Sequence, residues 1–260
     1  RLVAIRSSTR EAAGAAAAAI MTTDTHPKEV VVDGGGFTVG GMAKGAGMIA
    51  PNMATMLSVL TTDADVPPTV LRQALRRAVA ASFNELIVDG ATSTNDTVIV
   101  LASGQAGRPN EEALGKALEA ACIDLAEQMA EDAEGTTRVA LVRVIGAASN
   151  EDARRCARGI AGSLLVKASL FGADPYWGRI VSELGSAGAS FDIDKVSVAY
   201  GGVVVCDRGI DVAHDRDAVA AHMSTPRIEI VCDLGLGAGS ALVRTTDIGH
   251  GYIDENMRTS

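Results

Sequence analysis

Aromatic residues are scarce in this chain of 260 residues: they make up 3%, although hydrophobic residues reach 47%. The core therefore has to be built from Ala, Val, Leu, Ile and Met, and the 28 glycines favour turns and close backbone contacts. Basic residues are also in deficit, which gives a formal net charge of −9. This balance argues against a nucleic-acid partner, because phosphate binding requires clustered Lys and Arg. It leaves small anionic substrates open, since a local site can oppose the overall charge.

Cysteine is rare and widely spaced, with no pair at metal-ligand or redox spacing. Buried free thiols in a reducing cytosol are the expected state. The four histidines are equally scattered, and we expect neither a metal nor an organic cofactor. The apolar stretch over residues 12–20 is shorter than the roughly 20 residues that a membrane span needs, and the order of a signal peptide is missing. The prediction is a cytoplasmic protein without a membrane partner. The cysteines are Cys122, Cys156, Cys206 and Cys232.

Hydrophobic periodicity predicts a mixed α/β (α+β) protein with layered sheets and helices. Apolar residues at helical spacing and glycine-flanked β-rich runs alternate along the chain, without an internal repeat. The expected helices cover residues 8–21, about 17 residues from Pro67, 110–131 and 153–170. The expected strands cover residues 29–32 and 37–39 as a hairpin, then 56–62, 97–102, 139–144, 196–200, 203–206, 228–232 and 241–245. Residues 171–179 are expected to form a loop.

The joint between Ala54 and Thr55 could be cut from within the chain. The hydroxyl of Thr55 can attack the preceding carbonyl, pass through an ester and release a chain that begins with Thr55. The free α-amine of that threonine has a reference pKa of about 7.7–8.0, so it can act as the base for its own hydroxyl. By residue chemistry alone, the same residues also fit a glycine-rich loop that enters a buried segment.

A set of short strings across the chain extends this signal. They surround the Ala54–Thr55 joint and continue, in one order, almost to the end of the sequence. The strings are GGMAKG (40–45), MIAPNMATML (48–57), TTDTHPK (22–28), STND (93–96), DAEG (132–135) and FGADPYWGR (171–179). Together they closely resemble the ornithine acetyltransferases, the bifunctional glutamate N-acetyltransferases of arginine biosynthesis. The resemblance is closest to the actinobacterial members.

The resemblance implies a self-cleaving acyltransferase without a cofactor. Its reaction would move the acetyl group of N2-acetylornithine to glutamate through an acetyl group on Thr55, and acetyl-CoA would be a second possible donor. Residues 1–54 would be the C-terminal part of an α chain, and residues 55–260 a β chain. The two chains would fold as one interleaved unit with the ornithine acetyltransferase fold. Cleaved pairs would assemble into an α/β heterotetramer.

The resemblance also implies site residues. Thr55 is the nucleophile and one of the substrate-binding residues. Lys44 could bind a substrate carboxylate and lower the pKa of a neighbouring amine by charge repulsion. Glu134 suits the charged amine of ornithine. The remaining substrate contacts that the resemblance implies are Thr22, Asn256 and Ser260. Helix termination is the structural alternative for Thr22, and a frayed terminus is the alternative for Asn256.

Three departures from the family pattern remain. Tyr176 stands where most members have asparagine, and the chain end lacks the usual tyrosine, which weakens the match at Ser260. Members also carry well over a hundred further residues upstream of Arg1, including a Thr-Gly pair that stabilises the oxyanion. We therefore expect an N-terminally truncated sequence. Two alternatives stay open: an aminopeptidase or amidase of the same fold with an N-terminal nucleophile, and an inactive fragment.

Overall fold

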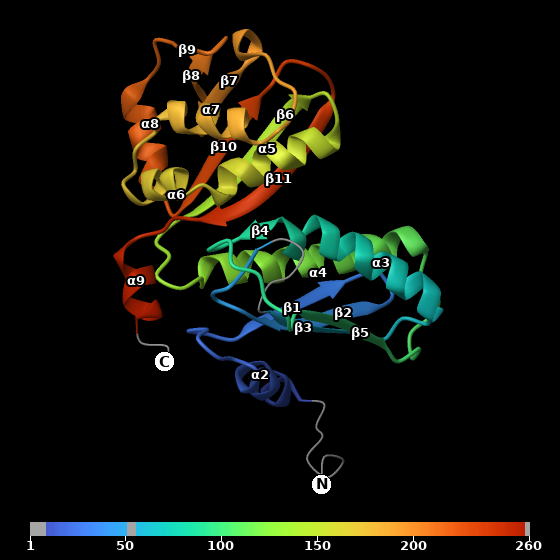
Figure 1. The fold of residues 1–260 in the computed structure, drawn as a ribbon. Coiled ribbons are helices and arrows are strands. Elements are labelled where there is room, and N and C mark those ends of the chain that lie inside the picture. The colour runs from blue at the N-terminus through green and yellow to red at the C-terminus, as the bar shows by residue number, and fades with distance from the viewer. Residues whose placement is uncertain (1–8, 51–55, 258–260) are drawn as a thin grey trace. The chain divides into compact units, whose positions relative to one another are not determined.

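The chain divides into two compact units in the computed structural model, which describes residues 9–50 and 56–257. The first unit consists of Arg1–Asn84 and Ala91–Ala133, and the second of Glu85–Gly90 and Glu134–Ser260. Each unit contains one β-sheet with helices against it (Figure 1). This architecture confirms the predicted mixed α/β class.

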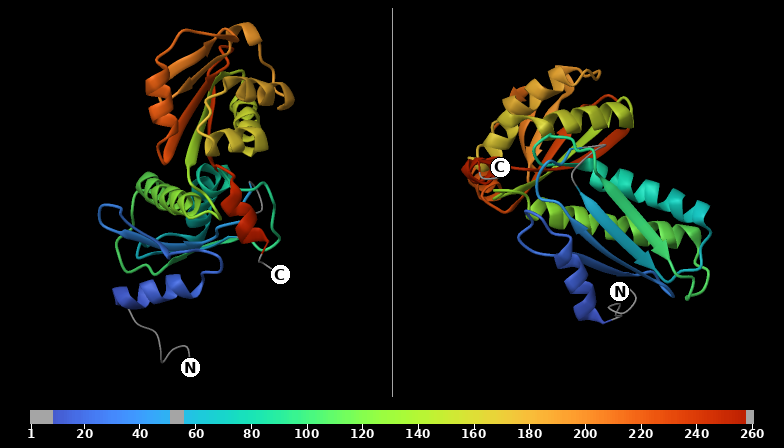
Figure 2. Two further views of the ribbon diagram at one scale, coloured as in Figure 1. Left: turned by 90° about the vertical axis from the view of Figure 1, so that its left-hand side faces the viewer. Right: turned by 60° about the horizontal axis from the view of Figure 1, so that its bottom comes forward.

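The first unit is a four-stranded sheet in the order β1-β2-β3-β5. Strands β1, β2 and β3 are antiparallel neighbours, whereas β5 runs parallel to β3. Helices α3 and α4 pack together on one face of the sheet, and α2 lies on the other face (Figures 1 and 2). The elements are α2 (Arg10–Ala19), β1 (Lys28–Asp33), β2 (Thr38–Lys44), β3 (Leu57–Thr62), α3 (Pro68–Ala81), β5 (Thr97–Ala102) and α4 (Glu111–Glu131).

The predicted hairpin joins β1 to β2. Gly35 and Gly36 have φ angles of +75° and +113°, a backbone region that side chains disfavour and glycine adopts at little cost. The amide of Gly34 donates to the carbonyl of Phe37 at 2.8 Å, which closes the turn. The strands extend further than predicted, and β2 ends at Lys44.

The second unit is a seven-stranded sheet in the order β4-β11-β6-β10-β7-β8-β9. Its central strand pair, β6 and β10, is parallel, and β11 lies antiparallel to β6. The strands are β4 (Leu86–Ile87), β6 (Val139–Ala147), β7 (Ser197–Tyr200), β8 (Val203–Asp207), β9 (Ile210–Asp211), β10 (Arg227–Asp233) and β11 (Gly239–Thr246). The helices are α5 (Asn150–Gly162), α6 (Leu164–Phe171), α7 (Trp177–Ser186), α8 (Arg216–Met223) and α9 (His250–Asn256).

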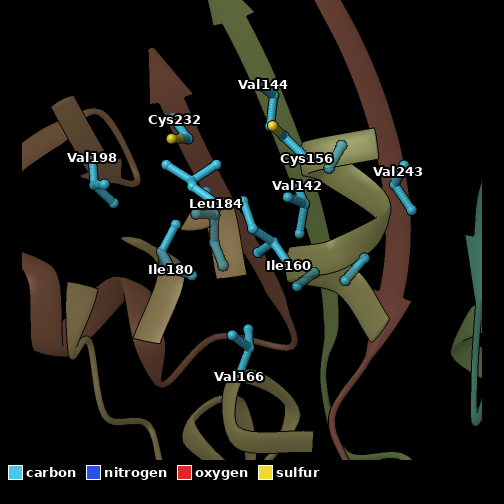
Figure 3. Packing of buried hydrophobic residues seen from close by; sticks show 14 of the residues in the cluster. Val142, Val144, Cys156, Ile160, Val166, Ile180, Leu184, Val198, Cys232 and Val243 are labelled. Carbon is cyan, nitrogen blue, oxygen red and sulfur yellow. The ribbon is translucent and has the colours of Figure 1, made fainter. Parts of the chain in front are cut away.

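Small and branched aliphatic side chains fill the core of the second unit, as the composition requires. Strands β6, β10 and β11 meet helices α5 and α7 there, and the thiols of Cys156 and Cys232 are part of the packing (Figure 3). All four cysteines of the chain are buried free thiols, as predicted. Burial raises the pKa of Cys122 to about 12, which makes that thiol unreactive near neutral pH.

The single helix predicted over residues 153–170 is wrong, because Ser163 divides it into α5 and α6. Ser163 has an extended backbone (φ −70°, ψ 123°), and its hydroxyl accepts the amide of Val166 at 3.4 Å as the N-cap of α6. The loop predicted over residues 171–179 is partly wrong, since α7 begins within it at Trp177. The predicted helix from Pro67 is shorter than expected, because Ser82 leaves the helical region after Ala81.

Candidate active site

Two of the predicted substrate-binding residues lie together in the first unit. Thr22 is in the polar break between α2 and β1, and Lys44 is the last residue of β2. Nζ of Lys44 lies 3.5 Å from Oγ1 of Thr22. Lys44 is half-buried and Thr22 is exposed, so an ammonium group and a hydroxyl face solvent side by side. Such a pair can bind the carboxylate of a small molecule.

A buried carboxylate connects the segments that carry these two residues. Oδ2 of Asp24 accepts the amide of Thr22 at 3.1 Å, and its Oδ1 accepts the amide of Gly45 at 2.7 Å. Gly45 directly follows Lys44 and has a φ of +151°. The turn after β2 is therefore attached to the polar break before β1 through one side chain.

Asp24 is part of an ionic network that is almost completely removed from solvent. The side chain of Lys28 is fully buried, and its Nζ lies 2.6 Å from Asp24 and 2.6 Å from Asp132. Asp132 also accepts the backbone amide and the hydroxyl of Thr25. Burial alone would raise the pKa of both carboxyls, but the donors around them outweigh it and hold both pKa values below the ordinary range.

The predicted cleavage residues Ala54 and Thr55 lie outside the described residues, and so does Ser260. The structure describes the chain again from Met56 onwards. The amide of Met56 donates to Oδ1 of Asp96 at 3.0 Å, and its carbonyl accepts the amide of Thr97 at 3.1 Å. Strand β3 then pairs with β2 so that Leu57 stands opposite Lys44. The first residues described after the joint therefore lie beside Lys44.

Asp96 is a candidate residue that was not named from the sequence, although it ends the family string STND. Burial raises the pKa of Asp96, while the Met56 amide and the charge of Lys44 lower it in part. An acidic residue directly before a strand was the available signal. The pairing of that strand with β3 could not be derived from the string itself.

The other two described candidates, Glu134 and Asn256, are hydrogen-bonded in the second unit. Nδ2 of Asn256 donates to Oε2 of Glu134 at 3.0 Å and to the carbonyl of Tyr252 at 2.9 Å. Asn256 is the last residue of α9, so this position is helical and not a frayed end. Glu134 follows shortly after α4, as predicted, and the pair combines a carboxylate with an amide that can bind a cationic group.

A glycine after Glu134 allows α9 to approach closely. Gly135 has a φ of +65°, and a Cβ atom at this position would stand 2.0 Å from the amide nitrogen of Tyr252. The hydroxyl of Tyr252 lies 3.3 Å from Oδ2 of Asp89. Burial and the Asp89 carboxylate raise the pKa of Tyr252 to about 12. Tyr252 therefore stays neutral and can donate a hydrogen bond to Asp89.

In the part of the chain that the structure describes, no group of three or more His, Cys, Asp or Glu side chains is placed to hold a metal ion. Within the described ranges, no helix is both long enough and apolar enough to cross a membrane.

Comparisons with known proteins agree on one family. The family model described as "ArgJ family" matches residues 2–259. The chain is 52% identical to the "Arginine biosynthesis bifunctional protein ArgJ" of Mycolicibacterium paratuberculosis, over 94% of this chain and 60% of that protein. It is 46% identical to the protein of the same description from Streptomyces avermitilis, over 94% of this chain and 63% of that protein. The chain thus spans about three-fifths of the length of such relatives.

A solved structure gives the same result at the level of the fold. The crystal structure of arginine biosynthesis bifunctional protein argJ from Bacillus halodurans matches with a TM-score of 0.72 and 34% sequence identity. The match covers 76% of this chain and 96% of that chain.

Proposed function

The chain belongs to the ArgJ family, and on that premise we propose that the protein transfers the acetyl group of N2-acetylornithine to glutamate in arginine biosynthesis. The observation that carries the proposal is the position of Lys44. Its ammonium group lies beside Thr22, and the β2–β3 pairing sets Lys44 opposite Leu57, two residues after Thr55. A carboxylate-binding cation beside the strand that follows the proposed nucleophile suits an N-acetylated amino acid, which has one carboxylate.

The first step is self-cleavage. Oγ of Thr55 attacks the carbonyl carbon of Ala54, the peptide bond shifts to an ester, and water hydrolyses that ester. The products are a carboxylate on Ala54 and a free α-amine on Thr55. The length of the solved relative supports this step. That chain is about four-fifths as long as this one, since 76% of this chain covers 96% of it. Residues 55–260 are also about four-fifths of the sequence.

The transfer follows a ping-pong route on the new N-terminus. The α-amine of Thr55 takes the hydroxyl proton while Oγ attacks the acetyl carbonyl. The C–N bond to ornithine then breaks, and ornithine leaves with the proton on its α-amine. Glutamate's amine attacks the acetyl ester, forms acetylglutamate and returns the proton to Oγ of Thr55. The atoms balance without a cofactor or a metal.

Each pair of proposed site residues has a role of its own. Lys44 and Thr22 bind the α-carboxylate that acetylornithine and glutamate share. Glu134 and Asn256 bind the charged side-chain amine of ornithine, a role that the 3.0 Å contact between them supports by combining a carboxylate with an amide oxygen. Ser260 completes this set as a hydroxyl at the chain end.

Several further properties belong to the proposal. Acetyl-CoA serves as a second acetyl donor, the protein acts in the cytoplasm, and cleaved pairs assemble into an α/β heterotetramer. The strand order supports chains that remain interleaved after cleavage, because β2 precedes the proposed cut and its neighbour β3 follows it.

The test is an acetyl-transfer assay on the complete gene product with acetyl-labelled N2-acetylornithine. With glutamate present, we expect labelled acetylglutamate and an equal amount of ornithine. Without glutamate, we expect one ornithine per active site and a labelled protein, because the acetyl-enzyme has no acceptor. Continuous release of free acetate without glutamate would contradict a transferase and indicate a hydrolase of the same fold.

A further inference from the structure

Asp24 is a buried carboxylate that takes no part in the proposed chemistry. It lies in the break between α2 and β1, and its side chain is completely shielded from solvent. Three donors converge on it: the amide of Thr22 at 3.1 Å, the amide of Gly45 at 2.7 Å and Nζ of Lys28 at 2.6 Å. A buried carboxylate is costly unless such partners compensate it. The three donors therefore stabilise the Asp24 carboxylate, and the carboxylate in turn holds the three donors in fixed positions.

Two of these donors come from the segments that hold the proposed carboxylate-binding pair. Thr22 donates its own amide, and the second amide is that of Gly45, the neighbour of Lys44. Thr22 and Gly45 are 23 residues apart in sequence, yet their amides meet on the two oxygens of one side chain. The spacing between the Thr22 hydroxyl and the Lys44 ammonium group follows from this attachment.

The third donor fixes Asp24 itself. Lys28 is the first residue of β1, so its backbone is held in the sheet opposite Ala43. Its ammonium group lies between Asp24 and Asp132, 2.6 Å from each. Asp132 in turn accepts two hydrogen bonds from Thr25. Asp24 is thus attached to the sheet and to the end of α4, and it has little freedom to move.

We infer that Asp24 is a positioning residue for the substrate-carboxylate site, acting through the backbone of Thr22 and Gly45 without contacting substrate. The inference rests on the proposed roles of Thr22 and Lys44. A charge-assisted hydrogen bond to a buried carboxylate is roughly twice as strong as a neutral one. A displacement of about 1 Å at a substrate-positioning group can change turnover or binding about a hundredfold. Asp24 therefore determines affinity for the carboxylate of N2-acetylornithine.

The test is Asp24→Asn in the complete gene product, with Asp65→Asn as the matched control. Asparagine has the same shape, but it offers one acceptor oxygen, so its amide nitrogen has to face either Thr22 or the Gly45 and Lys28 donors. We expect KM for N2-acetylornithine to rise by about tenfold to a hundredfold, with kcat within about threefold of wild type. Asp65 is exposed in the same unit, and its variant should match wild type in both constants.

Hydrogen exchange tests the attachment without any activity. In the wild-type protein, the amides of Thr22 and Gly45 should exchange slowly, and Asp24→Asn should accelerate at least one of them by about tenfold or more. Rapid exchange of both amides in wild type would overturn the inference even if the variant failed to fold. An unchanged KM in a folded Asp24→Asn variant would also overturn it. If wild type showed no transfer, the proposed function would fail, and exchange would still decide whether Asp24 holds the two segments.

Discussion

Asp96 holds the amide of Met56, the residue that follows the proposed nucleophile. A carboxylate at this point fixes the backbone on one side of the bond that has to break. Lys44 lies at the end of β2, the strand that pairs with β3. Burial raises the pKa of Asp96, and the charge of Lys44 lowers it in part. Single side chains thus set the position of the segment after Thr55, just as Asp24 sets the segment around Lys44.

We predict that Asp96→Ala slows self-cleavage by about tenfold to a hundredfold, since an orphaned buried amide and a displaced backbone reduce the attack of Thr55 on Ala54. Asp96→Asn should restore most of the rate, because its side-chain oxygen can still accept the Met56 amide. The measurement is the fraction of cleaved chain against time after synthesis, by mass spectrometry. A wild-type cleavage rate in Asp96→Ala would show that this hydrogen bond is irrelevant.

Thr22, Lys44 and Glu134 became candidates because family strings carry them, and Asn256 because it matches the family near the chain end; their roles stay predictions. Asp24 and Asp96 stood in the same strings, but their roles depend on amides that are 21 and 40 residues away. Such contacts follow from strand pairing, which no local pattern encodes. Tyr176 is the N-cap of α7 without a side-chain cap bond, so the start of that helix lacks the usual N-cap signal in the sequence.

Periodicity predicts most of the longer helices and strands of this chain, but it does not predict where each of them begins and ends. The longer strands of both sheets appear where alternation and β-rich runs predict them, whereas the two-residue strands β4 and β9 were not predicted. Helices α5 and α6 follow one continuous apolar pattern. The two helices are separated at Ser163 because its ψ angle is extended and its hydroxyl caps α6. The same hydroxyl donates to Glu183 at 2.7 Å. Helix α9 was not predicted, since its seven residues are too few to show a period.

Helix α6 is joined to two strands by a buried lysine. Nζ of Lys167 donates to Oγ1 of Thr245 at 2.6 Å, to the carbonyl of Thr246 at 2.9 Å and to that of Ile87 at 3.3 Å. Burial lowers the pKa of Lys167 to about 7, against the opposing charges of Asp89 and Asp247. The ordinary lysine pKa is about 10.4, so between these two values the unfolded chain holds a proton that the folded chain has released.

The sign of the pH dependence follows from this difference. Within that window the unfolded chain binds one more proton than the folded chain. Raising the pH makes this proton binding less favourable, so the unfolding free energy rises. We predict that, relative to Lys167→Met, Lys167 adds about 1–2 kcal/mol to the unfolding free energy between pH 7 and about 8.5. The buried thiols, whose pKa burial raises above the ordinary value of about 8.5, lower the stability of both proteins equally over this range. The gain should be absent in Lys167→Met. Denaturant unfolding of both proteins across this pH range measures the gain. The same change of unfolding free energy with pH in both proteins would contradict a lowered pKa of Lys167.

At the scale of the whole molecule, the proposed cut runs through a sheet. Strands β2 and β3 pair over six residues, from Val39 opposite Thr62 to Lys44 opposite Leu57. The chain that ends at Ala54 would contribute β1 and β2, and the chain that begins at Thr55 would contribute β3 and β5. All residues of the second compact unit would belong to the chain that begins at Thr55. The covalent break would leave the hydrogen bonds and the packing of the first unit in place.

We predict that the two cleaved chains elute together in size-exclusion chromatography under native conditions, because the β2–β3 ladder and the helices packed on the sheet hold them. In concentrated denaturant the same sample should separate into two chains. The uncleaved Thr55→Ala protein serves as the control and should give one chain in both conditions. Separation of the chains in native buffer would contradict an interleaved sheet.

The central claim is that Thr55 cuts its own backbone and then carries the acetyl group. Its most direct test is the intact mass of the complete gene product beside that of Thr55→Ala, each combined with the acetyl-transfer assay. The account predicts two chains divided at Ala54–Thr55 and full transfer in wild type, and one uncleaved, folded and inactive chain in the variant. A single active chain in wild type, or normal transfer by Thr55→Ala, would contradict it.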